Sequence, residues 1–442
     1  MNIQLSDHFN CRRLLRFTLP SIVMMIFTSV YGVVDGFFVS NFVGKTSFAA
    51  VNFIMPFLMI LGAVGFMFGA GGGALIAKTM GEGRHEKAQK LFSLFVYVTV
   101  ICGIVIAVLG SIFIRPIAAF LGAEGTMLDE CVLYGRVLLP ALPFYMLQFE
   151  FQSFFVTAEK PQIGLAVTVV SGVANMILDA LFVAVLPWGL VGAAAATAVS
   201  QCLGGVIPLI YFGSRNTSLL RLRKWEMDGR ALLKACTNGS SELMSNISMS
   251  IVSMLYNSQL IKYAGEDGIA AYGVLMYVNF VFLAAFIGYS TGTAPIIGYH
   301  YGAGNHRELK SLRKKSFLLI VICSGGMFML AELLAKPLGG IFVGYDQKLL
   351  DLTVRAFTIY SFSFLFAGIA IFGSSFFTAL NDGLTSAVIS FLRTLVFQAA
   401  AVLLFPLYFG IDGIWLSIVA AEWMAMLVTL MFIVGKRKKY RY

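Results

Sequence analysis

Long apolar segments alternate with short polar connections along the whole chain. Each segment can hold a helix of about 20 residues, which is the length that crosses the hydrocarbon core of a bilayer. Runs such as 101–113 and 391–405 lack the alternation of apolar and polar residues that a membrane β-barrel requires. The pattern predicts an all-α integral membrane protein with twelve spans, at 14–43, 47–78, 90–114, 127–155, 162–185, 189–213, 235–263, 269–300, 316–343, 352–378, 384–409 and 411–435.

The two halves of the chain repeat each other. The turn Gly81-Glu-Gly-Arg-His85 returns 221 positions later as Gly302-Ala-Gly-Asn-His306, and the same offset relates other glycines, Gly44 to Gly265 and Gly189 to Gly410. Six spans is an even number, so the two copies have the same orientation and are related by an axis along the membrane normal. We predict an N-lobe of helices 1–6 at 1–213, a cytoplasmic linker at 214–230 and a C-lobe of helices 7–12 at 231–442.

Composition and charge agree with a membrane protein. The chain of 442 residues is 59% hydrophobic and only 12% charged, about half the charged share of soluble domains. Its net charge of +10 comes from Lys and Arg in alternate loops, which topology explains without a nucleic-acid partner. The excess lies in the loops on the side of the N-terminus. It predicts a multi-pass protein of the plasma (inner) membrane, surrounded by lipid bilayer, with both termini cytoplasmic.

An aspartate lies inside the first apolar segment, in the stretch Tyr31-Gly-Val-Val-Asp35. A charged aspartate at the centre of a bilayer costs about 3 kcal/mol even on the lenient insertion scale. Such a carboxylate normally faces a protein cavity, where it is protonated, paired or bound to a cation. We predict that Asp35 is the cation-coupling group of a secondary transporter. The alternative is an aspartate that only holds the helix bundle together through a hydrogen bond.

A second polar pair lies in the predicted fifth span. Asn175 and Asp179 are four residues apart and therefore share one helix face. If Asp179 lies close to Asp35, the titrations of the two acids are coupled, and one of them holds a proton near neutral pH. Alternatively, their oxygens bind Na+ together with Asn175 and a hydroxyl group. A purely structural polar network is the third interpretation.

Three further residues are candidates for a role in transport. Glu242 lies among serines on one face of the predicted seventh span, as expected for a C-lobe cation or substrate site. Glu150 in the fourth span is equally compatible with a functional and a structural role. Pro20 lies 15 residues before Asp35, and a proline inside a helix frees a backbone carbonyl and permits a bend. We hypothesise that Pro20 is a hinge of the first helix.

Enzymatic chemistry has no support in the sequence. No paired nucleophile and base, metal-binding cluster or nucleotide-binding motif is evident, and the six cysteines are scattered without metal-ligand or redox spacing. We therefore expect a carrier that needs no cofactor and no catalytic residues, other than a coupling ion.

The chain resembles the multidrug and toxic compound extrusion (MATE) family over its full length. The motifs that carry the resemblance are Val34–Gly44 followed by Ala49–Val51, the two Gly-x-Gly-x-His turns, Ala158–Pro161, Asn175-x-x-x-Asp179 and Trp188–Thr197. The resemblance implies twelve helices in two six-helix lobes that form a V-shaped cleft. It also implies a bacterial, monomeric antiporter that exports cationic or amphipathic compounds against H+ or Na+ by alternating access.

The same resemblance implies a coupling site in the N-lobe. In the DinF-like branch of the family, the site residues fall on Tyr31, Asp35, Asn175, Asp179 and Thr197 of this chain, and a Na+ ion would use the last four. The NorM-like branch adds acids in helices 7 and 10. Glu242 matches the first, but the predicted tenth span contains no carboxylate at its match, which leaves the N-lobe as the expected place of coupling.

Two other carriers remain as alternatives. A lipid-linked precursor flippase of the same superfamily usually has more helices or a cavity lined with Arg and Lys. A major-facilitator-type carrier also has two parallel six-helix halves, but its loop between helices 2 and 3 normally carries an Asp and paired Arg, which residues 81–85 lack. The sequence does not distinguish H+ from Na+ and does not define the substrates.

Overall fold

The computed structural model describes residues 3–344 and 346–442, and this part of the chain is helical and has no β-strand. The first half forms α1 (Cys11–Phe38), α2 (Lys45–Met67), α3 (Gly73–Gly81), α4 (His85–Phe120), α5 (Gly125–Leu138), α6 (Leu142–Thr157), α7 (Pro161–Asp179) and α8 (Gly189–Gly213). The second half forms α9 (Gly229–Gly302), α10 (His306–Val343), α11 (Gln347–Ser361), α12 (Phe364–Ala379), α13 (Gly383–Phe391), α14 (Phe397–Phe409), α15 (Ile411–Gly435) and α16 (Arg437–Tyr440). Short π-helical segments lie at Val39–Val43, Phe68–Gly72, Ala180–Val185 and Leu392–Val396.

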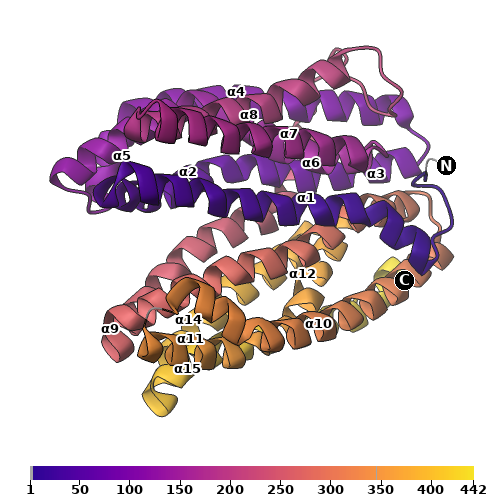
Figure 1. Ribbon diagram of the computed structural model, residues 1–442. Helices are drawn as coiled ribbons and strands as arrows, with labels where there is room; N and C mark the ends of the chain where they lie inside the picture. Colours follow the sequence, from indigo (N-terminus) through magenta and orange to yellow (C-terminus); the bar gives the residue numbers. More distant parts are fainter. Residues whose placement is uncertain (1–2, 345) are drawn as a thin grey trace.

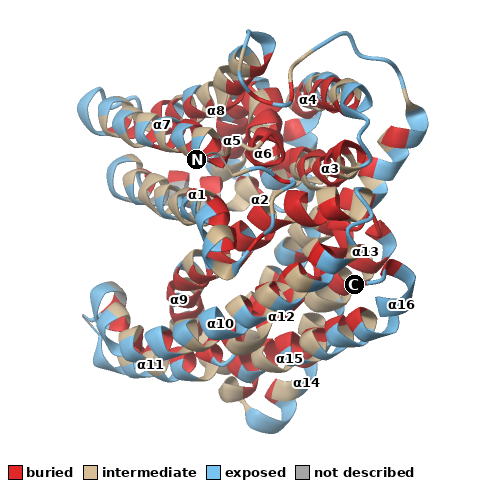
Figure 2. Cartoon of the chain, turned by 90° about the vertical axis from the view of Figure 1, so that its right-hand side faces the viewer, coloured by how far each residue is buried: buried red, intermediate tan, exposed pale blue. Residues whose placement is uncertain are grey.

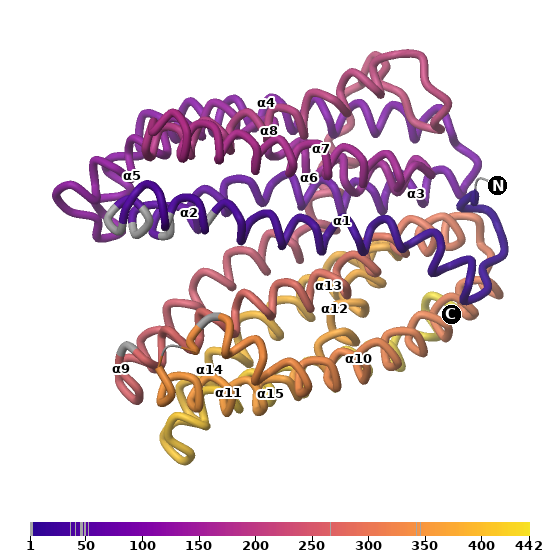
Figure 3. Tube along the Cα trace, in the orientation of Figure 1, coloured from indigo at the N-terminus to yellow at the C-terminus, as the bar shows by residue number. Residues whose placement is uncertain are grey.

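The helices correspond to the predicted spans, with one qualification. Among the described residues, ten helical stretches are long and apolar enough to cross a membrane, and the bent pair α11–α12 makes an eleventh. The predicted span 235–263 is the first part of α9, which turns sharply at Gly265. It is helical, but its polar stretch Thr237–Asn246 makes it less apolar than the others. Figure 3 shows α9 as two rods that meet at this turn.

The helices gather into two lobes. In Figure 1, α1–α8 form one group and α9–α15 form the other, and the groups meet toward the end where both termini lie and diverge toward α5 and the tip of α9. Figure 2 shows buried residues between the helices and exposed residues on the outer surfaces. The predicted all-α fold with two six-helix lobes is confirmed.

The outer helix faces are apolar, as contact with lipid requires. On α4, five exposed apolar side chains follow one another at helical spacing, Ile101, Ile104, Val105, Val108 and Ile112. In water such a stripe would be an interaction site or a liability. In a bilayer it is the expected surface of a spanning helix.

Glycines bring the two lobes into backbone contact. A Cβ atom on Gly81 of α3 would lie 2.0 Å from the carbonyl oxygen of Tyr299 in α9, and one on Gly302 would lie 2.0 Å from that of Lys78. Gly81 and Gly302 occupy matching positions of the repeat, so the contact is symmetric. Gly71 makes the same kind of contact with α9. Any side chain at these positions would push the lobes apart, as at other small-residue contacts between membrane helices.

The residues before α1 form a strap across both lobes, which we call the N-terminal strap (residues 3–10). The Leu5 N–H donates a hydrogen bond to Glu159 Oε1 of the N-lobe at 2.6 Å, and the Phe9 N–H donates to Glu308 Oε1 of the C-lobe at 3.0 Å. The Lys315 ammonium group donates to the carbonyl oxygen of Phe9. Leu5 and Phe9 are fully buried, so the strap is part of the fold and ties the lobes at the end where they meet.

Candidate functional site

Two acids meet between α1, α7 and α8 of the N-lobe. Asp35 comes from α1, and Asp179 is the last residue of α7; their carboxyl groups lie within electrostatic interaction range of each other. The Thr197 hydroxyl group of α8 donates a hydrogen bond to Asp35 Oδ1 at 3.5 Å. Asp179 is fully buried and Asp35 is half-buried. The structure therefore brings together the two acids and the hydroxyl group that the sequence analysis placed in one site.

A glycine allows α1 to approach α7 closely. A Cβ atom on Gly172 would lie 2.5 Å from the ring of Phe27 and 2.9 Å from the ring of Tyr31. Because Gly172 has no side chain, both aromatic rings of α1 rest on α7. Asp35 follows Tyr31 by four residues and so lies on the same face of α1. Because these rings pack closely on α7, Asp35 lies near the end of that helix.

The site is rich in oxygen atoms that lack partners. Within residues 3–344 and 346–442, both carboxyl oxygens of Asp179 and the Oδ1 atom of Asn175 are buried without a hydrogen-bond partner. No ion pair of the described residues includes Asp35 or Asp179. Buried carboxylates without a protein cation are expected to hold a proton or to bind a small cation. Binding of H+ or Na+ by these side chains stays a prediction.

Sequence reasoning missed Tyr134 of α5. This side chain is fully buried and is an electrostatic neighbour of Asp35 and Asp179, and its hydroxyl group lies near that of Thr197. The hydroxyl group also donates to the Met55 Sδ atom at 3.8 Å. A single tyrosine in an apolar span gives little signal in the sequence. The one sequence feature that could have pointed to Tyr134 is a phenol hydroxyl group inside an apolar span, because a polar group at membrane depth needs a partner.

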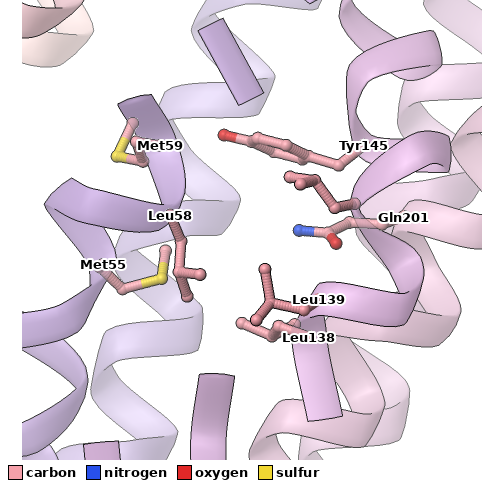
Figure 4. A pocket seen from close by; sticks show the side chains of 8 residues that line it. Met55, Leu58, Met59, Leu138, Leu139, Tyr145 and Gln201 are labelled. Carbon is pink, nitrogen blue, oxygen red and sulfur yellow. The ribbon is translucent and has the colours of Figure 1, made fainter. Parts of the chain in front are cut away.

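An apolar pocket lies within the N-lobe (Figure 4). It holds about 310 Å³ of empty space, part of it open to solvent, between α2, α6, α8 and the end of α5, and it is lined by Met55, Leu58, Met59, Leu138, Leu139, Leu142, Tyr145 and Gln201. Tyr145 is a neighbour of Tyr31, and Met55 contacts Tyr134, so two tyrosines link the pocket lining to the surroundings of the acids. Flexible methionines and an aromatic ring form a lining that adapts to ligands of different shape.

The C-lobe arranges its buried charges differently. Arg393 forms a bidentate ion pair with Glu422 of α15, at 2.8 Å from Nε to Oε2 and 2.9 Å from Nη2 to Oε1. Glu242 of α9 lies half-buried within electrostatic reach of the same Arg393. The predicted C-lobe acid thus has a cation nearby, and its role in cation or substrate binding stays a prediction.

The predicted hinge lies apart from the site. Pro20 is inside α1, which is one continuous helix from Cys11 to Phe38. The neighbouring Thr18 and Ser21 are buried where Gly288 and Gly292 of α9 pack against α1. Pro20 is therefore on the stretch of α1 that contacts the other lobe. Its role as a hinge stays a prediction.

A protein-family model described as MatE matches the chain twice, over residues 20–181 and 243–404. The multidrug export protein MepA of Staphylococcus haemolyticus is 24% identical over 430 residues, which is 97% of this chain and 94% of the relative. The MepA protein of Staphylococcus aureus strain MRSA252 is 24% identical over 428 residues, with 96% and 93% covered. The two matches to one model agree with the internal repeat.

Solved structures share the fold. An outward-facing multidrug resistance MATE family transporter of the MOP superfamily superposes with a TM-score of 0.93 at 22% identity, covering 100% of this chain and 98% of that one. A MOP superfamily transporter from Pyrococcus furiosus superposes with a TM-score of 0.91 at 21% identity, covering 98% of each chain. At this identity the likeness establishes the arrangement of helices.

Proposed function

Because the chain belongs to the MatE family of membrane transporters, and is a carrier rather than an enzyme, we propose that it is a secondary multidrug exporter. It exchanges cationic or amphipathic compounds for H+ or Na+ by alternating access. The names of its staphylococcal relatives, multidrug export proteins, support the direction of transport. We also propose that it works as a monomer in the bacterial plasma membrane with both termini in the cytoplasm.

The observation that carries this proposal is the acid pair without a protein cation beside an adaptable pocket. Asp35 and Asp179 supply negative charge or protonated carboxyl groups, and the pocket of Met55, Tyr145 and Gln201 supplies apolar surface. A cationic compound is attracted while the acids are ionised. It is released when H+ or Na+ neutralises them, because the charge that held it is gone.

Alternating access gives this exchange a direction. The lobes meet near the termini and diverge at the opposite end (Figure 1), and in the proposed cycle this arrangement opens the N-lobe site to one side of the membrane. Movement of the two lobes relative to each other, with opening of glycine contacts between them, would change the side of access. Binding of the coupling ion favours one arrangement only if the ion binds the two arrangements with different affinity.

The test is ethidium transport into inside-out vesicles under separately imposed gradients. One set of vesicles receives a pH gradient, a second receives a Na+ gradient and a third receives neither. We expect one of the two gradients to drive ethidium accumulation, which identifies the coupling ion. If neither gradient drives accumulation while the protein is present in the membrane, the proposed function is wrong.

A further inference from the structure

Glu150 is a buried acid that the proposed coupling site does not use. It lies in the middle of α6, where its side chain is fully buried, and within the described residues both carboxyl oxygens lack a hydrogen-bond partner. Gln148, two residues earlier, is directed toward Tyr31. Residues two apart on a helix point in nearly opposite directions, so Glu150 faces away from the Asp35 site.

The groups that surround Glu150 are neutral. From α4 it meets the buried, uncharged hydroxyl group of Thr99 and the thiol of Cys102, which lies within electrostatic range. From the π-helical segment Phe68–Gly72 it meets Gly69, where an added Cβ atom would lie 3.1 Å from the Glu150 Cα atom. Cys102 is the titratable group that faces it, and no ion pair of the described residues includes Glu150.

This environment requires the neutral carboxyl group. An ionised carboxylate without a counter-charge or hydrogen bonds is strongly disfavoured in a dry interior, and it takes up a proton instead. An acid that stays neutral permanently brings no advantage over an apolar side chain. An acid inside a membrane protein is therefore expected to act at some stage of its cycle.

The π-helical segment Phe68–Gly72 packs both on the backbone of α6 at Glu150 and on the C-lobe. Gly69 lies against the Glu150 Cα atom, and Gly71 packs on the backbone of α9, where its Cβ atom would lie 2.0 Å from the Ala235 carbonyl oxygen. Cys236 of α9 lies within electrostatic range of Cys102. One layer of protein therefore separates Glu150 from the C-lobe. If the lobes separate between segment Phe68–Gly72 and α9, this layer no longer packs against the C-lobe.

We propose that Glu150 is a second proton-binding site of the N-lobe, protonated while segment Phe68–Gly72 and α9 are in contact and ionised when that contact opens. On opening, the carboxyl O–H bond breaks and the proton passes to water that enters between the lobes. On closing, the carboxylate takes a proton from water. The inference rests on the proposed function, since the cycle of opening and closing belongs to a transporter.

The test is the number of protons exchanged per ethidium in proteoliposomes. At equilibrium, the slope of the logarithm of the ethidium ratio against the imposed pH difference gives this number. We expect Glu150→Gln, which resembles the protonated acid in shape, to lower the slope by one proton and to keep transport. The matched control is Glu86→Gln, an exposed acid on α4, which leaves the slope unchanged. An unchanged slope in Glu150→Gln overturns the proposal.

A second measurement does not depend on transport. Infrared spectra of the purified protein at neutral pH report the carbonyl stretch of protonated carboxyl groups. We expect this band to be weaker in Glu150→Gln than in the wild type. Identical spectra overturn the proposal, because Glu150 is then not protonated in the closed arrangement. Failure of the proposed function would appear differently, as an absence of gradient-driven ethidium movement in the wild type.

Discussion

The first and sixth helices of each lobe meet at a hydroxyl group, but the partner of that group differs between the lobes. In the N-lobe, Thr197 of α8 donates to Asp35 of α1 at 3.5 Å. In the C-lobe, Ser417 of α15 lies 2.7 Å from the hydroxyl group of Tyr256 in α9. Tyr256 is 221 positions after Asp35, which is the offset of the repeat. One copy of the fold therefore holds an ionisable acid where the other holds a phenol.

The lobes also differ in how they balance buried acids. Asp35 and Asp179 have no protein cation among the described residues, whereas Glu422 is paired with Arg393 through two charge-assisted hydrogen bonds. A paired acid is already satisfied, and a small cation gains little by binding it. An unpaired acid is available to a mobile ion. The comparison supports the proposal that the N-lobe acids, rather than the Arg393–Glu422 pair of the C-lobe, couple transport to an ion.

The largest expected effect is the difference in ethidium efflux between variants of Asp35 and variants of Tyr256. Asp35→Asn removes the ionisable group and is expected to abolish ethidium efflux while expression is retained. Tyr256→Phe removes one hydrogen bond, worth about 1 kcal/mol, and is expected to leave most of the efflux. Ethidium efflux from cells, with expression checked by immunoblot, provides the measurement. Wild-type resistance in Asp35→Asn would refute the assignment of coupling to the N-lobe.

The next effect concerns the stability of the C-lobe pair. Arg393→Met leaves Glu422 buried and unpaired, and removing one partner of a buried ion pair costs about 3–5 kcal/mol. The double variant Arg393→Met/Glu422→Met removes both charges and is expected to recover most of that loss. Thermal unfolding in detergent compares the two. A double variant as unstable as the single one would mean that the pair does more than balance charge.

A smaller effect lies in the loop between α12 and α13. Burial raises the pKa of Asp382, but hydrogen bonds from Lys436, Tyr440 and Thr385 together lower this pKa below its ordinary value. The folded protein therefore keeps the carboxylate, and its stabilisation is present above the ordinary aspartate pKa of about 3.9. It is lost only as pH falls through the lowered pKa.

We expect Asp382→Asn to lower the free energy of unfolding by about 1.5–3 kcal/mol at neutral pH, the range for hydrogen bonds to charged groups. The difference between wild type and variant should stay constant between about pH 5 and 8 and shrink only below about pH 4. The corresponding N-lobe loop holds Glu159. Burial raises the pKa of Glu159, although the hydrogen bond from the Leu5 N–H acts to lower this pKa. A wild-type advantage that disappears already near pH 6 would contradict the assigned pKa.

The smallest expected effect concerns Pro20. The position 221 residues later is Ser241, so a proline hinge would belong to the N-lobe alone. Pro20→Ala is expected to slow the initial rate of ethidium efflux by a few-fold, since bending of α1 becomes harder. Ser241→Ala is the matched control and should leave the rate unchanged. An unaltered rate in Pro20→Ala would remove the hinge hypothesis.

The sequence predicted the helices and the repeat because apolar length and a constant offset are properties of the chain itself. It also selected Asp35, Asp179 and Thr197, which the structure brings together, although their function stays a prediction. It did not select Tyr134 or pair Arg393 with Glu422. These contacts depend on how each helix is rotated against its neighbours, and apolar residues on nearly every face leave that rotation undefined.

The N-terminal strap has a practical consequence for protein production. Leu5 and Phe9 are seated between the lobes, and the two glutamates that hold them, Glu159 and Glu308, belong to different lobes. A purification tag placed ahead of residue 3 therefore needs a linker that leaves both side chains in their sites. Removal of residues 3–9 by a protease would delete the hydrogen bonds that tie the two lobes together. A preparation should therefore be checked for an intact amino terminus before its activity is compared with that of any variant.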